Sequence, residues 1–496
     1  MRAPRVRGVI GPAWWSLLGR LGLPKDRWRS IPKWQRRAME FGLWGGIAFL
    51  IVLFVSHDYL ATVITFAVVA ALIVPPWHKV PRFGRYIVPV ALLFIVVMYP
   101  FYYVKEFTMP IFGSFPGVGT AVVMVIFIMM AIGLNMVVGY AGLLDLGYVA
   151  FYAMGAYTAA WFASLQFPQV TFHLGDVGVP KTTNDKGQLV DQFGFHVSIW
   201  LLLLLAGITT ALIGVLIGLP TLRLRGDYLA IVTLGFGEIM PQVANNGNDL
   251  FGTGFNLTGG PQGITPVDAP GFGKTLSDAT GGFLPEVYTT CCQAKAFGHQ
   301  ISFEDLFFWT GIVLLLFTIF CSVRLRDSRL GRAWVAIRED EIAAAAMGIP
   351  LMRTKTWAYA SGAFFGGIAG AYFVAFKQST FPGDFFFNIS VFILCMVILG
   401  GMGNIWGVML GAAFLAYLDR EGLANTGAWL NEHGVSNFVF GKDIDVPLYA
   451  SGIYGTIILL VMLFRPEGLI PDRRRQHELH EGVSDQPLYD VDAQTG

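Results

Sequence analysis

Residues Ser328 to Pro350, which read SRLGRAWVAIREDEIAAAAMGIP, form a charged segment between two apolar runs of membrane length. Val335, Ile342 and Ile349 follow one another at intervals of seven residues, and Ala346 falls on the same helical face. This spacing predicts a short amphipathic helix that is too short and too charged to span a bilayer. Such a helix lies along the membrane surface or docks into a partner, and a solvated connecting helix is the simpler alternative.

The expected ends of this helix are marked by residue type. Asp340 and Glu341 suit a helix start, because carboxylates accept hydrogen bonds from the free N–H groups of the first turn. Gly348, followed by Pro350, suits a helix end, because glycine adopts the left-handed conformation that stops a helix.

The composition places the chain outside the range of soluble proteins. Of the 496 residues, 54% are hydrophobic and only 14% are charged, and the mean hydropathy is +0.58. These values indicate a polytopic integral membrane protein. A net charge of +1 without a basic patch suggests no nucleic-acid function.

Roughly twelve apolar runs are each long enough to cross or deeply enter a bilayer core of about 30 Å. They predict an all-α protein with about 10–12 transmembrane or membrane-embedded helices. The seventh, tenth and eleventh runs are short, and Gly235, Gly237 and Pro241 in the seventh predict a broken or re-entrant element. The runs are 41–56, 59–76, 86–104, 117–138, 141–165, 197–219, 228–244, 303–323, 356–376, 388–400, 404–418 and 448–464.

The distribution of lysines and arginines indicates which loops are cytoplasmic, because cytoplasmic loops of membrane proteins carry an excess of these residues. We place the amino terminus inside and let the chain change sides at each apolar run. With this assignment, 26 of the 34 lysines and arginines lie inside, as do both termini. The segment 328–350 then lies on the cytoplasmic side. The long loops 166–196 and 245–302 lie outside, where we expect caps or docking surfaces.

Several enzyme motifs are absent from the sequence. Gly273, Lys274 and Thr275 look like the end of a phosphate-binding loop, but Asp268 stands where the motif requires its first glycine. The histidines and cysteines show no metal-ligand spacing, and no catalytic residues or cofactor site are indicated. The adjacent Cys291 and Cys292 form either a strained disulfide or two unpaired loop thiols. We therefore expect no enzyme activity in this chain.

Two acidic residues lie within apolar runs, where burying a charge costs about 2.5–3.5 kcal/mol. Asp145 lies one turn into its run, which suits either a helix start near the interface or a functional site. Glu238 lies deeper, beside two glycines and before a proline, which favours a position facing a transport pathway.

Six stretches of the sequence, taken together and in order, resemble one known family, the larger of the two permease subunits of bacterial branched-chain amino acid ABC importers. The resemblance covers about residues 117 to 472. The stretches are GLNMVVGYAGLLDLGYVAFYAMGAY at 133–157, RGDYLAIVTLGFGE at 225–238, LTGGPQGI at 257–264, LGRAWVAIREDEIAAAAMGI at 330–349, LGGMGNIWG at 399–407 and RPEGLIP at 465–471.

The resemblance implies the ABC importer permease fold and a particular assembly in the bacterial cytoplasmic membrane. The chain would pair with a second, homologous permease subunit and bind two cytoplasmic ATP-binding subunits, while an extracytoplasmic substrate-binding protein delivers the amino acid. The expected parts are a basic cytoplasmic segment with an interfacial helix at 1–40, a three-span extension at 41–105, a permease core at 117–465 with a coupling loop at 324–355, and a cytoplasmic tail at 466–496.

Two groups of site residues follow from this resemblance. The segment 328–350 resembles the family's coupling helix, which contacts the ATP-binding subunits; its expected contact residues are Arg332, Arg338, Glu339, Asp340 and Glu341, with Gly348 ending the helix. Glycine-rich breaks and the two buried acids are candidates for the translocation path, and tight helix packing is the alternative for each glycine. These candidates are Gly139, Gly142, Asp145, Gly147, Gly155, Gly235, Gly237, Glu238, Gly400, Gly401 and Gly403.

Other functions remain as alternatives. Related permeases carry urea, amides or other amino acids. An ion-coupled secondary transporter is more remote, because the sequence offers few intramembrane charges and has the cytoplasmic segment instead. An integral-membrane enzyme would need clustered His, Asp or Glu residues at one interface, and no such cluster is present in the sequence.

Overall fold

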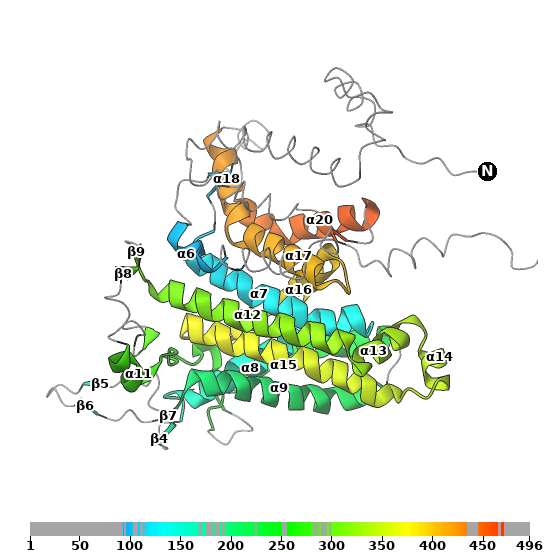
Figure 1. Ribbon diagram of the computed structural model, residues 1–496, viewed down its shortest axis with the longest axis horizontal. Helices are drawn as coiled ribbons and strands as arrows, with labels where there is room; N and C mark the ends of the chain where they lie inside the picture. The colour runs from blue at the N-terminus through cyan, green and yellow to red at the C-terminus, as the bar shows by residue number, and fades with distance from the viewer. Residues whose placement is uncertain are drawn as a thin grey trace, which may run out of the picture. The chain divides into compact units, whose positions relative to one another are not determined.

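The computed structural model divides into two units, Met1–Pro110 and Ile111–Gly496 (Figure 1). Apart from α6 and β1, which belong to the first unit, the fold described below is that of the second. The structure describes mainly residues 116–167, 194–223, 226–249, 255–280, 299–433, 445–464 and 468–470. The predicted segment at 1–40, most of the extension at 41–105, Cys291, Cys292 and the tail from 471 lie outside the described residues.

Six helices among the described residues are long and apolar enough to cross a membrane. They confirm an all-α polytopic membrane protein. They are Val118–Tyr140 (α7 with the π-helical turn η2), Ile199–Thr221 (α9), Phe303–Asp327 (α12), Leu351–Lys377 (α15), Pro382–Gly400 (the turn η6 with α16) and Val446–Phe464 (the turn η8 with α20).

The remaining elements are shorter or more polar. The helices are α6 (Tyr99–Tyr102), α8 (Val149–Phe162), α10 (Gly226–Asn246), η4 (Gly260–Gln262), α11 (Gly273–Ala279), α13 (Arg329–Glu339), α14 (Glu341–Ala346), α17 (Ile405–Tyr417), η7 (Leu418–Gly422) and α18 (Leu423–Glu432). The strands are β1 (Thr108–Met109), β2 (Gly113–Ser114), β3 (Ala163–Ser164), β4 (Thr171–Leu174), β5 (Thr182–Thr183), β6 (Leu189–Val190), β7 (Gly194–Val197), β8 (Lys295–Ala296) and β9 (His299–Gln300).

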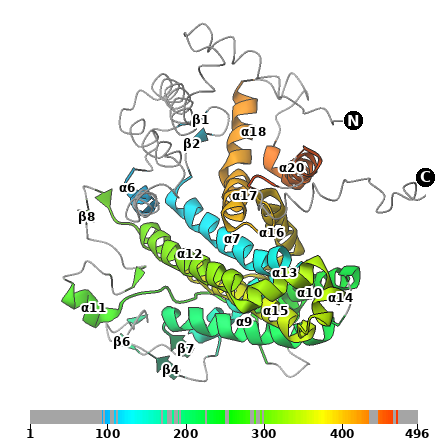
Figure 2. The same ribbon diagram turned by 45° about the vertical axis from the view of Figure 1, so that its right-hand side comes forward.

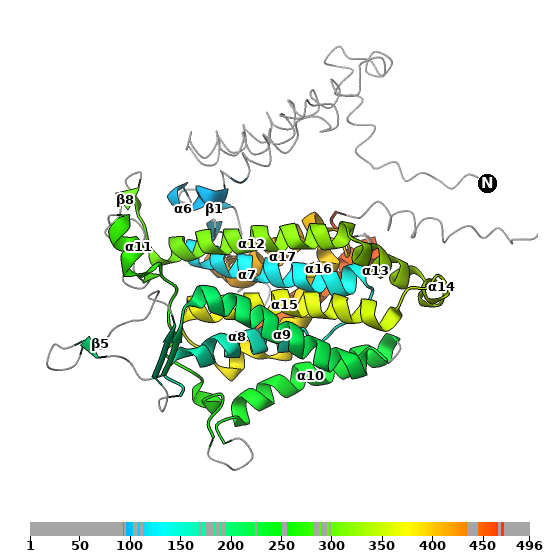
Figure 3. The ribbon, with the colours of Figure 1, turned by 60° about the horizontal axis from the view of Figure 1, so that its bottom comes forward.

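Helix α15 lies at the centre of the bundle, packed against α7, α8 and α9 (Figures 1 and 3). Small residues along it allow this close approach, as is common between membrane helices. A Cβ atom at Gly155 of α8 would overlap the backbone of Gly367, and one at Gly367 would overlap Thr210 of α9. The apolar core is therefore built around backbone contacts of α15.

Helix α10 is continuous from Gly226 to Asn246, so the predicted break at 228–244 is wrong, while a re-entrant element there stays a prediction. Gly235, Gly237 and Pro241 lower its intrinsic helix propensity, but packing of one face outweighs propensity in a folded protein. That face includes Thr233, whose hydroxyl accepts a hydrogen bond from the backbone of Leu146 at 3.1 Å.

The chain stays helical beyond the eleventh apolar run, which ends at Leu418, because η7 and α18 follow α17 directly. Figure 2 shows α17 and α18 in line. The charged residues of η7 find partners in the bundle: Glu421 accepts from the backbone N–H of Gly117 at 3.0 Å, and Asp419 accepts from the hydroxyl of Tyr454 at 2.8 Å. Arg420 lies over the ring of Phe127.

The two long loops meet at the end of the bundle opposite α13 and α14 (Figure 1). His196 of β7 and Asp268 form a buried pair, with Nδ1 and Oδ2 2.6 Å apart. The Trp161 indole donates to the carbonyl of Leu257 at 2.7 Å. Burial raises the pKa of Tyr288 to about 12, so its hydroxyl stays protonated beside Thr310, 2.9 Å away. The loops thus cap the bundle.

Candidate functional site

The segment between α12 and α15 folds into two short helices, α13 and α14. Asp340 separates them in an extended conformation and caps α14, because its Oδ1 accepts from the N–H groups of Ile342 and Ala343 at 2.8 and 3.0 Å. Gly348 follows α14 with a φ of +83°, which suits a residue without a Cβ. The helix start at Asp340 and its end at Gly348 are as the sequence predicts.

The apolar face predicted for this segment is not the face that packs on the chain's own bundle. Trp334 and Ile337 are buried, and the Trp334 indole donates to the carbonyl of Thr354 at 2.8 Å. Ile342 and Ala346 are exposed instead. The seven-residue spacing assumed one continuous helix, and the extended backbone at Asp340 turns the second helix relative to the first.

The tip of the segment presents apolar side chains. Ile342 is 81% exposed and Met347 is 84% exposed, although both are large hydrophobic residues. Arg332, Glu339 and Glu341 are exposed too, and Glu341 also pairs with Lys355 of α15 at 2.7 Å. The tip is therefore an apolar projection on a segment that also exposes charged residues, which suits insertion into a groove of another protein.

Arg338 points the other way, into the bundle. Its Nη1 donates to the carbonyl oxygen of Gly139 in η2 at 2.7 Å. A Cβ at Gly142, where φ is +69°, would lie 2.8 Å from the Arg338 Cγ, and one at Gly403, where φ is +92°, would lie 3.5 Å from Nη1. Asn135 Oδ1 accepts from the N–H of Gly403 at 2.8 Å. The structure therefore brings Arg338 together with three of the path candidates.

Most of the other glycine candidates lie in close contact with the chain's own backbone or side chains. A Cβ at Gly147 would overlap the carbonyl of Thr233, and one at Gly400 would overlap that of Gly407. Gly237 faces Phe387 and Gly147, and Gly401 has a φ of +108°. Packing accounts for glycine at Gly147 and Gly400, as it does at Gly155, and the left-handed backbone accounts for it at Gly401. Gly235 is different, because nothing lies within 4 Å of its Cβ position.

The two acids have contrasting surroundings. Asp145 is buried in the turn between η2 and α8, where its Oδ1 accepts from the N–H of Gly147 at 2.9 Å. Tyr359 of α15 lies next to it. Glu238 is exposed near the middle of α10. The structure does not bring the two carboxylates together into one site.

Sequence reasoning missed the charged turn η7 and Lys355. Asp419 and Glu421 follow the end of an apolar run, which is a pattern typical of a loop. Their partners, Tyr454 and Gly117, lie 35 and 304 residues away in sequence. No local signal could have indicated that these charges are paired inside the bundle.

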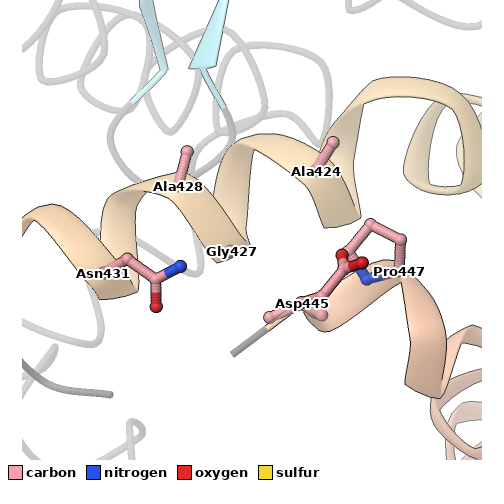
Figure 4. Close-up of a pocket in the computed structure, with 7 residues that line it drawn as sticks. Ala424, Gly427, Ala428, Asn431, Asp445 and Pro447 are labelled. Carbon is pink, nitrogen blue, oxygen red and sulfur yellow. The ribbon is translucent and has the colours of Figure 1, made fainter. Parts of the chain in front are cut away.

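An open cavity of about 380 Å³ lies between α18 and η8 (Figure 4). Its polar side chains are Asn431 of α18 and Asp445 before η8, and its other lining residues are Ala424, Gly427, Ala428, Val446 and Pro447. None of the predicted site residues lines it. Within the described ranges, no three His, Cys, Asp or Glu residues are grouped as metal ligands would be.

Comparisons with known proteins agree with these features. Two permease proteins LivM of high-affinity branched-chain amino acid transport systems, from Salmonella typhimurium and Escherichia coli, are each 35% identical to this chain. The alignments cover 79% and 80% of this chain, and 76% and 77% of the relatives. A probable branched-chain amino acid transport permease protein LivM from Methanocaldococcus jannaschii is 24% identical over 70% of this chain and 91% of its own length.

No solved structure matches the chain. The profile of the family described as branched-chain amino acid transport system permease component matches residues 118–462. This match begins with α7, ends in α20 and includes the segment α13–α14 with both of its flanking spans. The chain therefore belongs to the family of permease components of branched-chain amino acid transport systems.

Proposed function

We propose that this chain is the permease subunit of an ABC importer that carries leucine, isoleucine and valine across the bacterial cytoplasmic membrane. The family match over 118–462 is the observation that carries this proposal. The names of the three relatives supply the substrate class. A permease of this family for urea, amides or other amino acids is the alternative.

Energy for transport comes from separate subunits in this proposal. The chain works with a second, homologous permease, two cytoplasmic ATP-binding subunits and an extracytoplasmic substrate-binding protein. Both termini and the segment α13–α14 lie on the cytoplasmic side. The exposed Ile342, Met347, Arg332 and Glu339 contact the ATP-binding subunits, since the segment presents an apolar projection and also exposes charged residues.

The exposed face of α10 supports a position for the translocation path. Glu238, Gln242 and Asn245 share this face with Ile231 and Leu234. A charged side chain facing lipid costs about 2.5–3.5 kcal/mol near the bilayer centre. This face therefore suits water and a zwitterionic amino acid better than lipid, with the Glu238 carboxylate near the substrate ammonium and the apolar residues near its side chain.

Reconstitution tests the proposed function. Liposomes containing this chain, the second permease and the ATP-binding subunits, with the binding protein added outside, are expected to accumulate radiolabelled leucine only when ATP is supplied inside. Unlabelled isoleucine and valine are expected to compete, and urea and acetamide are not. Leucine uptake by this chain alone, without ATP, would contradict the proposal, and competition by urea would move the substrate to the alternative class.

Glu238→Gln is expected to raise the KM for leucine uptake about tenfold, because the isosteric amide removes the charge that attracts the ammonium group. Glu238→Asp, which keeps the charge, is the matched control and should retain more activity. The measurement is the initial rate of uptake in the liposomes over a range of leucine concentrations.

Cysteine labelling checks the same face independently. In a variant lacking the four native cysteines, Ile231→Cys and Gln242→Cys are expected to react with a membrane-impermeant thiol reagent, whereas Ala230→Cys and Ala244→Cys, which are buried, are not. Reaction of the first pair with lipid-soluble reagents alone would show that this face of α10 lies against lipid.

A further inference from the structure

Arg338 is part of α13 in the segment between α12 and α15, but its side chain contacts the helix bundle. The two exposed acids beside it, Glu339 and Asp340, face solvent, while its guanidinium donates to the Gly139 carbonyl, 199 residues away in sequence. A cation near the carboxyl end of a helix is stabilised by the free carbonyl groups there. η2 is the carboxyl end of the first described span, so this contact joins α13 to the end of that span.

The site that receives Arg338 is made from two breaks in the bundle. Gly142 lies in the turn from η2 to α8, and Gly403 lies in the turn from α16 to α17. Both have positive φ values, of +69° and +92°, and both lie against the Arg338 side chain. Asn135 of α7 is fully buried and contacts the second break, since its Oδ1 accepts from the N–H of Gly403.

Helix α13 is connected both to the spans that flank its segment and, through Arg338, to parts of the bundle that are distant in sequence. Ser328 connects α13 to α12, because it ends the one helix and caps the other. Trp334 connects it to α15 through the carbonyl of Thr354. Arg338 adds η2 and the α16–α17 turn. A segment held at all of these places moves together with the ends of four spans, whereas a segment held only by its own chain could move alone.

We propose that Arg338 is a positioning residue that passes the movement of α13–α14 to the turn after η2 and to the α16–α17 turn, instead of contacting the ATP-binding subunits. This inference rests on the proposed function and deepens it. An arginine suits the role because its planar guanidinium carries five donors in fixed geometry and keeps its charge, while its stem packs against Gly142.

The experiment uses the complete importer in liposomes and compares Arg338→Ala and Arg338→Lys with Arg329→Ala. Arg329 is the matched control, because it is an exposed arginine on the same helix. Three quantities are measured: retention of the ATP-binding subunits during purification, the rate of ATP hydrolysis, and leucine taken up per ATP hydrolysed.

Arg338→Ala is expected to retain the ATP-binding subunits and to hydrolyse ATP, but to take up about tenfold less leucine per ATP, since one charge-assisted contact in the transmitting connection is lost. Arg338→Lys, which keeps the charge and replaces the planar guanidinium by an ammonium with three donors, should recover part of this ratio. Arg329→Ala should match the unmodified importer. If the alanine variant does not accumulate in the membrane, the lysine variant carries the test.

Hydrogen exchange separates transmission from simple structural support. Binding of the ATP-binding subunits is expected to change exchange in residues 329–348, 139–147 and 401–405 of the unmodified chain, but only in 329–348 of the Arg338→Ala variant, with a smaller change at 139–147 and 401–405 in Arg338→Lys. If Arg338→Ala takes up as much leucine per ATP as the unmodified importer, the inference is overturned. It is also overturned if this variant loses the ATP-binding subunits to the same extent as it loses leucine uptake. Absence of ATP-driven uptake in the unmodified importer contradicts the proposed function instead.

Discussion

Gly155→Ala is expected to lower the stability of the protein by at least about 2 kcal/mol, whereas Gly235→Ala is expected to leave it equal or raised. A Cβ at Gly155 would overlap the carbonyl oxygen and Cα of Gly367, at the crossing of α8 and α15. The backbone of α15 cannot move away without disturbing α9, because Gly367 lies against Thr210. At Gly235 no atom lies within 4 Å, so alanine adds helix propensity without a clash.

The two variants are a matched pair, since each changes a helical glycine to alanine. The measurement is the amount of monodisperse protein extracted from membranes and its midpoint of thermal unfolding in the same detergent. Stability is the quantity to compare, because Gly235 is also a candidate for the translocation path. Equal midpoints for the two variants would show that α8 and α15 do not cross as closely as the structure has it.

Replacing Ile342 and Met347 together by glutamate is expected to weaken binding of the ATP-binding subunits at least about a hundredfold and to abolish leucine uptake. Each side chain is more than four-fifths exposed, and burying it in a partner contributes about 1.5–3 kcal/mol. A carboxylate placed in the same groove would lose its hydration without gaining a partner.

Replacement of both residues by leucine is the matched control, because leucine keeps the apolar surface and nearly the same volume. The measurement is a titration of the ATP-binding subunit against the permease pair in nanodiscs, followed by uptake in liposomes. Normal binding by the glutamate variant would exclude the tip of α14 from the contact and would leave the charged residues Arg332 and Glu339 as the candidates.

Local features of the sequence predicted the parts of this protein that depend on local physics. A run of about twenty apolar residues forms a membrane helix because the bilayer imposes that length, and five of the six described spans follow such runs; the remaining span, Pro382–Gly400, includes the shorter run 388–400. The start of α14 at Asp340 and its end at Gly348 were also predictable, since capping involves atoms only a few residues apart.

Other features depend on partners that are distant in sequence. Helix α17 continues through η7 into α18 because Asp419 and Glu421 meet Tyr454 and Gly117. Helix α10 is continuous because one of its faces packs on the turn that contains Leu146 and Gly147, and packing there outweighs its glycines and proline. Neither result could be obtained from apolar run lengths alone.

The sequence by itself determined the class of protein, the position of the charged segment between two spans and the family to which the chain belongs. Only the tertiary structure decided which side of that segment faces outward, so that Ile342 and Met347 are exposed while Arg338 reaches Gly139. The reason is physical: run length and caps are set by neighbouring residues and the bilayer, whereas the direction of a side chain depends on which distant backbone lies within reach.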